Sequence, residues 1–405
     1  MNLTDVDDKT IRRSQEEKIP LRSFTMKYIQ EFFKDLETLN ISKAETFPRA
    51  TDHIPEMVEL VKTLLEKDIA YKTEDGIYFN INKFKEYGKL SKVDLENMKR
   101  GGRCASDSYD KENINDFALW KFWDKEDGDA FWETDIGKGR PGWHLECSVM
   151  SMKYLGESFD IHTGGVDLIF PHHENEIAQS EAATGKQFVK YWIHNEYILV
   201  EGKKMSKSLG NFFTLRDILD KGYNPKAIRY LLLSAHYRTQ FNFSFDALEA
   251  ADKAISRLLE FMDNLSHIKD KDKQESPVEN EAVNELLNTV KKEFEENMDD
   301  DLNIAGALAS IFEFVKKVNV LMNSDKLTVG SATAITDTME KFDIVLGVLE
   351  EEKQEIPKDV KTLAEKREEA RKAKKWDESD KLRDQIQELG YTVADTKDGF
   401  ILKKL

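Results

Sequence analysis

Side chains that can bind zinc recur between residues 142 and 211. His172 and Glu176 are four positions apart, and Pro171 just before them suggests that a helix begins here. Residues four apart share one face of a helix, so this imidazole and this carboxylate would lie side by side. Cys147 could add a thiolate, and the three groups would suit a zinc ion with one or two open positions. A buried cysteine beside an ordinary polar helix start is the alternative.

A second candidate for chemistry is the short basic segment Lys204-Met-Ser-Lys-Ser208. It follows an expected hairpin, in which residues 196–200 form a strand and Glu201-Gly-Lys supplies the turn. Lys204 and Lys207, with hydroxyls beside them, could hold a polyphosphate and oppose the charge that builds up in phosphoryl or nucleotidyl transfer. A solvated basic loop is the alternative.

The composition predicts a soluble globular protein with two or three domains. Of the 405 residues, 34% are charged and 40% are hydrophobic, and no apolar run approaches the length of a membrane span. The acidic N-terminus does not resemble a signal peptide. Two cysteines, Cys104 and Cys147, exclude a disulfide scaffold and fit a cytoplasmic location. A net charge of −17 argues against general nucleic-acid binding, but local basic strips could still bind a tRNA.

The order of expected elements predicts an α/β fold for the first half of the chain. A helix starts near Thr51, and one of its faces is apolar: Met57, Leu60, Val61 and Leu64. Residues 69–71 and 76–80 are expected to form a hairpin. The stretch from about 83 to 139 is polar and is expected to be irregular, with Trp120 and Trp123 packed in a core.

The second half of the chain is expected to be helical. Four long helices are predicted, at about 244–265, 279–297, 305–322 and 331–349, and their apolar faces are typical of a bundle. After a polar linker, a charged helix, a second helix and a small hairpin close the chain. By itself, this tail could be a solvated helical extension.

Together, the motifs are far more specific than any one of them. Gly142-Trp-His-Leu-Glu-Cys147 precedes Phe159-Asp-Ile-His-Thr-Gly-Gly-Val-Asp167, then Pro171-His-His-Glu-Asn-Glu176, then Lys204-Met-Ser-Lys-Ser208. In this order and at these spacings, the chain resembles the cysteinyl-tRNA synthetases, a family of class I aminoacyl-tRNA synthetases.

The resemblance implies an architecture. Residues 1–245 would form a Rossmann-like α/β catalytic and nucleotide-binding domain, with about 83–139 as an insertion. A helical bundle at 246–350 would bind tRNA, and a small module at 357–405 would contact the anticodon region. The protein is expected to be a monomer.

The resemblance also implies a reaction with cysteine tRNA, L-cysteine and ATP, the last with Mg²⁺. Cysteine and ATP would give cysteinyl-adenylate and pyrophosphate, and the cysteinyl group would then pass to the 3′ end of the tRNA. Serine differs from cysteine by one atom, and shape alone discriminates poorly at that level. One zinc ion per chain would solve this problem, because a thiolate is a better zinc ligand than a hydroxyl.

Roles for individual residues follow from the resemblance. Cys147, His172 and Glu176 would be the zinc ligands, and Thr4 and Trp143 would line the amino-acid pocket.

The ATP side of the reaction is assigned in the same way. Gly165 and Asp167 lie where the family binds substrate or the nucleotide ribose, and Lys204 and Lys207 would stabilise the pyrophosphate leaving group. His162 would lie near the reacting centre, although a strand-end histidine bonded to backbone fits the sequence equally well.

One part of the family pattern does not appear in this sequence. Family members carry a first strand, an early zinc-ligand cysteine and a His-Ile-Gly-His-type ATP motif before the position of Thr4. Here no histidine precedes His53, and no cysteine precedes Cys104, whose surroundings do not match that ligand. We therefore expect the chain to lack a fourth zinc ligand and to activate cysteine poorly. A misassigned start is favoured over a missing part supplied by a separate chain and over a remnant.

Two other functions share parts of this pattern. A cysteine ligase paralogue acting on an amino-sugar would use the same zinc and adenylate sites but would need no tRNA module, and the residues beyond Pro357 argue against it. A catalytically inactive remnant that binds tRNA or zinc would have little need for the basic segment at 204–208.

Overall fold

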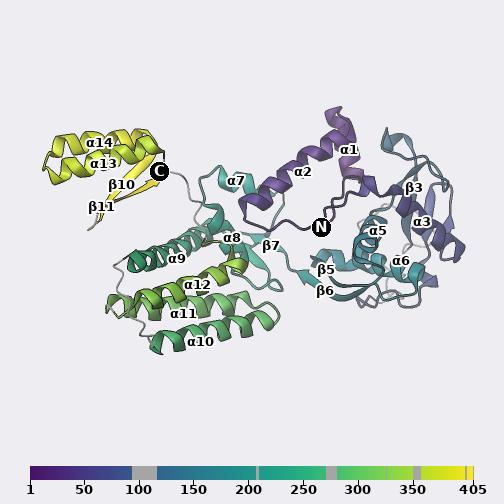
Figure 1. Cartoon of the computed structure of the whole chain (residues 1–405). Coiled ribbons are helices and arrows are strands. Elements are labelled where there is room, and N and C mark those ends of the chain that lie inside the picture. Colours follow the sequence, from purple (N-terminus) through teal and green to yellow (C-terminus); the bar gives the residue numbers. More distant parts are fainter. Residues whose placement is uncertain are drawn as a thin grey trace. The chain divides into compact units, whose positions relative to one another are not determined.

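The computed structural model describes residues 1–93, 116–206, 209–270, 281–324, 326–349, 357–396 and 399–404. The chain divides into two compact units, Met1–Leu349 and Glu350–Leu405, and each is described by itself. Figure 1 labels their helices and strands.

The first unit opens with three helices, α1 (Asp8–Glu17), α2 (Leu21–Thr38) and α3 (Ile54–Glu66). The Asp7 side chain caps α1 by accepting from the backbone N–H of Thr10, and Pro20 immediately precedes α2. Helix α3 begins near the predicted position and buries its predicted apolar face, with Met57, Val61 and Leu64 fully inside the core. Short 3-10 turns occur at Ala50–Asp52, Ile81–Lys83 and Lys125–Asp127.

A four-stranded antiparallel sheet shares a hydrophobic core with α1 and α3. Its order is β1 (Ala70–Lys72), β2 (Gly76–Phe79), β3 (Phe117–Phe122) and β4 (Gly139–Pro141). The prediction that the whole stretch 83–139 is irregular was wrong, because the aromatic run at 117–122 pairs with β2 and β4 as an inner strand. Trp120 is buried as predicted, but Trp123 is 37% exposed, with the Lys138 ammonium 3.9 Å from its ring centroid. Cys104 lies outside the described residues.

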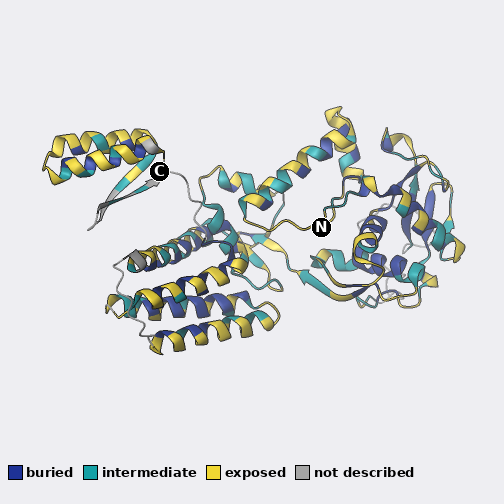
Figure 2. Ribbon diagram, in the orientation of Figure 1, coloured by how far each residue is buried: buried dark blue, intermediate teal, exposed yellow. Residues whose placement is uncertain are grey.

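A parallel β-α-β unit follows. Its elements are α5 (Trp143–Leu155), β5 (Phe159–Gly165), α6 (Glu174–Thr184) and β6 (Val189–Asn195), with turns at Val166–Leu168 and Ile169–His173 before α6. β5 and β6 pair in parallel from Phe159 opposite Val189 to Gly165 opposite Asn195. Figure 2 shows α5 and the first half of α6 as largely buried helices. Open α/β sheets bind ligands at the carboxyl ends of such parallel strands.

A three-stranded sheet and two capped helices come next. The sheet has the order β8 (Lys203–Lys204), β7 (Ile198–Val200) and β9 (Phe241–Phe243). The predicted hairpin is confirmed, since β7 and β8 pair antiparallel around a turn at Glu201 and Gly202, both with positive φ. The Thr214 and Asn224 side chains cap α7 (Leu215–Leu219) and α8 (Pro225–Leu233), and Pro225 occupies the first position of α8.

Four long helices complete the first unit and lie side by side in Figure 1. They are α9 (Phe245–Asp270), α10 (Glu281–Asp299), α11 (Ile304–Asn323) and α12 (Val329–Leu346). Their inward residues form one apolar core that includes Leu258, Ile311, Ile335 and Met339. The predicted bundle is therefore confirmed, with α9 longer than expected.

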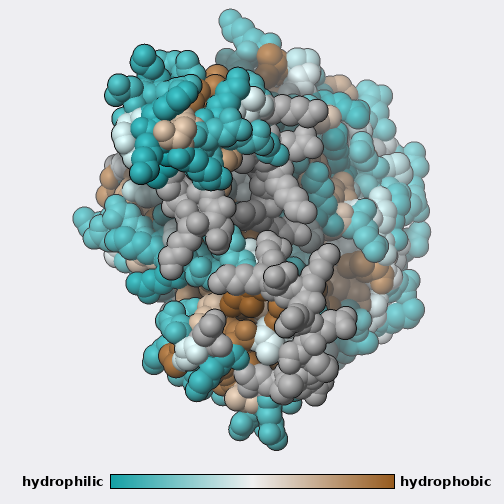
Figure 3. All heavy atoms as spheres, turned by 60° about the vertical axis from the view of Figure 1, so that its left-hand side comes forward, coloured by the Kyte–Doolittle hydropathy of each residue, from teal (hydrophilic) through white to brown (hydrophobic). Residues whose placement is uncertain are grey.

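The second unit is small. Helices α13 (Lys358–Lys372) and α14 (Trp376–Glu388) pack on a hairpin of β10 (Tyr391–Thr396) and β11 (Gly399–Lys404) around Val360, Ala364 and Ile386. Among the described helices of both units, none has the length and apolar character needed to cross a membrane. The described surface in Figure 3 is mainly hydrophilic, with apolar side chains in small groups.

Candidate metal and substrate site

Cys147, His172 and Glu176 come together where α5 packs against the start of α6. Their potential ligand atoms all lie within 4.8 Å of one another. The three residues are 8%, 3% and 0% exposed, and His172 Nε2 lies 3.0 Å from Glu176 Oε1. His173 and Glu174 have helical backbone angles, so the helical turn extends back toward His172. The local prediction of a shared helical face is therefore right.

The chemistry of these three side chains fits a divalent cation. Neither carboxylate oxygen of Glu176 has a hydrogen-bond partner among the described residues, although both are buried. A buried carboxylate without a partner is costly, and a bound cation would remove that cost. Burial, reinforced by Glu176 and Glu146, raises the pKa of the Cys147 thiol well above its usual range. Without a cation this thiol is neutral, but a bound zinc ion would favour loss of its proton. A thiolate, an imidazole and a carboxylate form a donor set typical of zinc.

His144 orients the imidazole ring of His172. The Nδ1 atoms of His144 and His172 lie 2.8 Å apart, so one ring donates to the other and His172 Nε2 is directed at Glu176. Burial, with His172 second, lowers the pKa of His144 well below its usual value, so its ring is neutral and can accept this hydrogen bond. The sequence reasoning missed His144. Its position one helical turn before Cys147 was the available signal.

Three further histidines lie on the side of β5 and β6, and two of them, His162 and His173, have ring nitrogens within 4.8 Å of a Glu176 carboxylate oxygen. His162 Nε2 lies 3.6 Å from Glu176 Oε2, and His173 Nδ1 lies 2.8 Å from His194 Nε2. Burial, followed by the neighbouring histidines, lowers the pKa of His173 to about 2. No role was predicted for His173 or His194. Their contact joins the start of α6 to the end of β6, which no local pattern reveals.

Glycine is required where β5 passes this histidine group. A Cβ atom at Gly164 would lie 2.6 Å from His173 Cε1, which is too close for any other residue without displacement. The Gly-Gly pair in the motif therefore lets the strand approach the imidazole closely.

The two residues predicted to line an amino-acid pocket come from different segments, Trp143 from the start of α5 and Thr4 from the N-terminal segment. The Trp143 ring centroid is 4.2 Å from that of His172, and the side chain is 42% exposed. Thr4 is exposed on the N-terminal segment, which reaches α5 through a hydrogen bond from Asn2 Nδ2 to Cys147 Sγ at 3.1 Å. Asp5 fixes this segment by accepting from the backbone N–H and hydroxyl of Thr51.

The predicted nucleotide contacts lie at the carboxyl end of β5. Gly165 ends the strand, and Asp167 is exposed in the turn that follows. A Cβ atom at Gly165 would lie 2.4 Å from Asp167 Oδ1, so a larger residue there would displace the exposed Asp167 side chain. Both residues stand where parallel α/β sheets bind their ligands.

Lys204 is exposed on the edge strand β8, with its ammonium 5.4 Å from the Tyr197 ring centroid. Asn211 spans the adjoining loop, since its side chain accepts from the Ser206 N–H at 2.9 Å and donates to the Lys204 carbonyl at 3.2 Å. Lys207 lies outside the described residues. Within the described parts of the chain, no hydrogen bond or ion pair joins Lys204 to Gly165 or Asp167.

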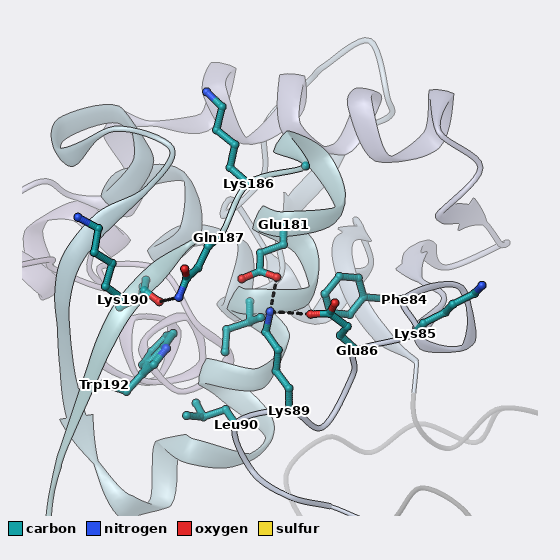
Figure 4. A pocket seen from close by; sticks show the side chains of 13 residues that line it. Phe84, Lys85, Glu86, Lys89, Leu90, Glu181, Lys186, Gln187, Lys190 and Trp192 are labelled. Carbon is teal, nitrogen blue, oxygen red and sulfur yellow. Dashed lines mark hydrogen bonds and ion pairs between the residues drawn. The ribbon is translucent and has the colours of Figure 1, made fainter.

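A pocket of about 730 Å³ lies between residues 84–90, the end of α6 and β6 (Figure 4). Trp192 lines this pocket and also packs on His162 and His173, with ring centroids 4.7 and 4.8 Å apart. Lys89 pairs there with Glu86 and Glu181. The charges on this wall are thus largely matched within the protein.

The parallel unit, the motifs at its strand ends and the basic hairpin define a class I aminoacyl-tRNA synthetase. A family model described as "tRNA synthetases class I (C) catalytic domain" matches residues 1–253. The chain belongs to the cysteine--tRNA ligase family. A DALR domain model matches residues 293–350, and a model of the cysteinyl-tRNA ligase anticodon binding domain matches residues 353–400.

Curated relatives match over the whole chain. The cysteine--tRNA ligase of Chlamydia felis (strain Fe/C-56) is 48% identical over 408 residues, which cover 100% of this chain and 85% of the relative. That of Protochlamydia amoebophila (strain UWE25) is 49% identical over 410 residues, covering 100% of this chain and 84% of the relative.

Solved structures of other synthetases share the fold. The methionyl-tRNA synthetase of Mycobacterium tuberculosis bound by methionyl-adenylate has a TM-score of 0.58 at 14% identity, over 81% of this chain and 78% of that chain. A putative arginyl-tRNA synthetase from Campylobacter jejuni has a TM-score of 0.51 at 12% identity, over 81% and 68%. The α/β prediction with following helical domains is confirmed.

Proposed function

We propose that this ligase selects cysteine through a zinc ion held by Cys147, His172 and Glu176. The observation that carries the proposal is the fully buried Glu176 carboxylate, which has no hydrogen-bond partner among the described residues and faces an imidazole and a thiol. A zinc ion held there would prefer the sulfur of cysteine to the hydroxyl of serine.

The surrounding side chains would shape the amino-acid pocket. Trp143 lies against His172 and is exposed on its other side, so it can form one wall for the substrate. Thr4 would approach from the N-terminal segment. His162 would lie beside the reacting groups, and its position 3.6 Å from Glu176 supports a place near the substrate.

The ATP site would combine the end of β5 with the basic loop. Asp167 would accept from hydroxyl or ammonium groups, and Gly165 would allow the ligand to approach the backbone. Lys204 and Lys207, with Mg²⁺, would offset the charge of the departing pyrophosphate as cysteinyl-adenylate forms. The exposure of Lys204 on the edge of a sheet supports this role.

The remaining parts of the chain would bind tRNA. We assign residues 1–245 to catalysis, with an insertion at about 83–139, residues 246–350 to the tRNA-binding bundle, and residues 357–405 to the anticodon region. The match at 353–400 supports tRNA, rather than an amino-sugar, as the acceptor. Arg371 and Lys372 in the last turn of α13 offer positive charge for such a partner. The chain would act as a monomer, in the cytoplasm.

Elemental analysis and substrate competition test the proposal together. The purified chain should contain about one zinc ion per molecule. At whatever rate the chain reacts, cysteine should support pyrophosphate exchange into ATP and charging of cysteine tRNA far better than serine does. A chain without bound metal, or one that uses serine as readily as cysteine, would refute the zinc assignment. Exchange with no charging of tRNA would instead favour the amino-sugar ligase.

A further inference from the structure

We infer that Asp301, in the turn between α10 and α11, is a positioning residue for the edge strand β8, which carries Lys204. The inference rests on the proposed role of Lys204 in the ATP site. It concerns how the helical bundle reaches that strand, and it assigns a function to three consecutive residues after α8: His236, Tyr237 and Arg238.

Asp301 receives contacts from all three of these residues. The Tyr237 hydroxyl donates to Asp301 Oδ1 at 2.6 Å, and Arg238 Nε lies 2.9 Å from Asp301 Oδ2. His236 Nε2 lies 2.9 Å from the Asp301 carbonyl oxygen. Arg238 Nε also lies 2.9 Å from the Tyr237 hydroxyl, so the contacts form one closed network. We call these four residues the Asp301 latch.

The latch continues into the sheet that carries Lys204. The Glu196 N–H donates to the Tyr237 carbonyl at 2.8 Å, and the Phe241 N–H donates to the Tyr197 carbonyl at 3.1 Å. β9 then pairs in parallel with β7, and β7 pairs with β8, where Lys204 lies opposite Leu199. Tyr197 also faces the Lys204 ammonium. The contacts of the latch and these backbone hydrogen bonds therefore link the bundle to Lys204.

The backbone of the turn restricts the direction in which Asp301 points. Asp301 and Leu302 have φ angles of 54° and 58°. Aspartate and asparagine tolerate this left-handed region better than most other residues. Asp301→Asn should therefore keep the turn while it removes the charge that Arg238 and Tyr237 contact.

The location of the latch indicates that it positions groups rather than stabilises the fold. The Asp301 and Arg238 side chains are 44% and 66% exposed, and exposed ion pairs contribute little to stability. However, the latch joins the bundle, which we propose binds tRNA, to the sheet that ends at Lys204. Loss of the latch should leave the protein folded and should make strand β8, which carries Lys204, more mobile.

Limited proteolysis tests this change in mobility without using activity. Trypsin should cut after Lys203 and Lys204 several-fold faster in Asp301→Asn than in the unaltered chain. Asp300→Asn is the matched control, because Asp300 is exposed on the same turn and the substitution removes the same charge. Circular dichroism should show equal helix content in all three proteins. Equal cleavage rates in the two variants would overturn the inference.

A double substitution tests whether the contacts act as one network. Tyr237→Phe removes the hydroxyl that donates to Asp301, so it should also speed cleavage. The combined variant should be cut no faster than Asp301→Asn, because both changes break one linkage. Fully additive effects would show that the two residues act separately and would contradict the latch.

Exchange kinetics separate this inference from the proposed function. Asp301→Asn should lower the kcat of cysteine-dependent pyrophosphate exchange by about tenfold. It should leave the KM for cysteine and the zinc content unchanged. Lys204→Ala is measured in parallel. If it has no effect on exchange, the proposed ATP role is wrong. If it abolishes exchange while Asp301→Asn behaves like Asp300→Asn, the proposed role stands and the latch is wrong.

Discussion

The Nδ1 atoms of His144 and His172 lie 2.8 Å apart in the interior between α5 and α6. This contact uses one nitrogen of His172 and leaves the other, Nε2, 3.0 Å from Glu176 Oε1. A histidine that binds a metal through one nitrogen almost always has a hydrogen-bond partner at the other. The histidine pair is therefore the arrangement that a metal site built on His172 requires.

Replacement of His144 should weaken metal binding without removing a ligand. We expect His144→Ala to lower zinc affinity by about 10- to 100-fold, because His172 loses the partner that fixes its ring. Competition with a chromogenic chelator measures the affinity. His53→Ala is the control, because His53 is also buried but contacts Arg49 and Tyr154 instead. Equal affinity in the two variants would separate His144 from the metal.

Replacement of the buried Glu176 carboxylate should affect thermal stability differently with and without bound zinc. Glu176→Gln keeps the shape of the side chain and removes the charge that attracts a cation. In excess chelator, the variant should unfold at the same or a higher Tm, since a buried charge without a hydrogen-bond partner is unfavourable. With zinc added, the unaltered chain should gain the larger increase in Tm.

Thermal unfolding with and without zinc checks both halves of this prediction. An equal zinc-dependent increase in the two proteins would show that the cation binds elsewhere. A large loss of stability in chelator would show that Glu176 has a structural partner beyond the described contacts.

Gly142 determines how closely α5 approaches β3. A Cβ atom there would lie 1.9 Å from the Ala118 carbonyl oxygen. Gly142→Ala should therefore push away the start of the helix that carries Trp143 and Cys147, at a cost of about 1–3 kcal/mol in the free energy of unfolding. Urea denaturation measures this change. Gly330→Ala in α12 is the control, because its Cβ would have space and alanine favours helices. Similar stabilities of the two variants would contradict the close contact.

Features fixed by neighbouring residues could be predicted from the sequence. The spacing of His172 and Glu176, the Asn224-Pro225 start of α8 and the turn at Gly202 each depend on a few adjacent positions. By contrast, the contacts of His144 with His172 and of His173 with His194 join residues 28 and 21 positions apart. Such contacts depend on how the elements pack, which local periodicity does not encode.

The strand β3 was not predicted from the sequence, for a related reason. Its aromatic residues have high β propensity, but they lie within a polar stretch where an irregular insertion is the simpler interpretation. Only pairing with β2 and β4 makes it an inner strand. Trp123 lies one residue past the end of the strand, and its side chain packs with Lys138 at the surface rather than in the core.

Removal of the second unit should separate the two half-reactions. Residues 350–405 form a compact unit with an apolar core of their own around Val360, Ala364 and Ile386, while the candidate zinc and ATP residues all belong to the first unit. A chain ending at Leu349 should therefore keep its zinc content and its rate of cysteine-dependent pyrophosphate exchange. Charging of cysteine tRNA should fall by at least about tenfold through a higher KM for tRNA, because contacts to the anticodon region would be lost. Steady-state aminoacylation with the full chain as reference measures the effect.

Unchanged charging of tRNA would show that the second unit does not contribute to tRNA binding. Loss of pyrophosphate exchange would instead show that the first unit needs the second for its activity.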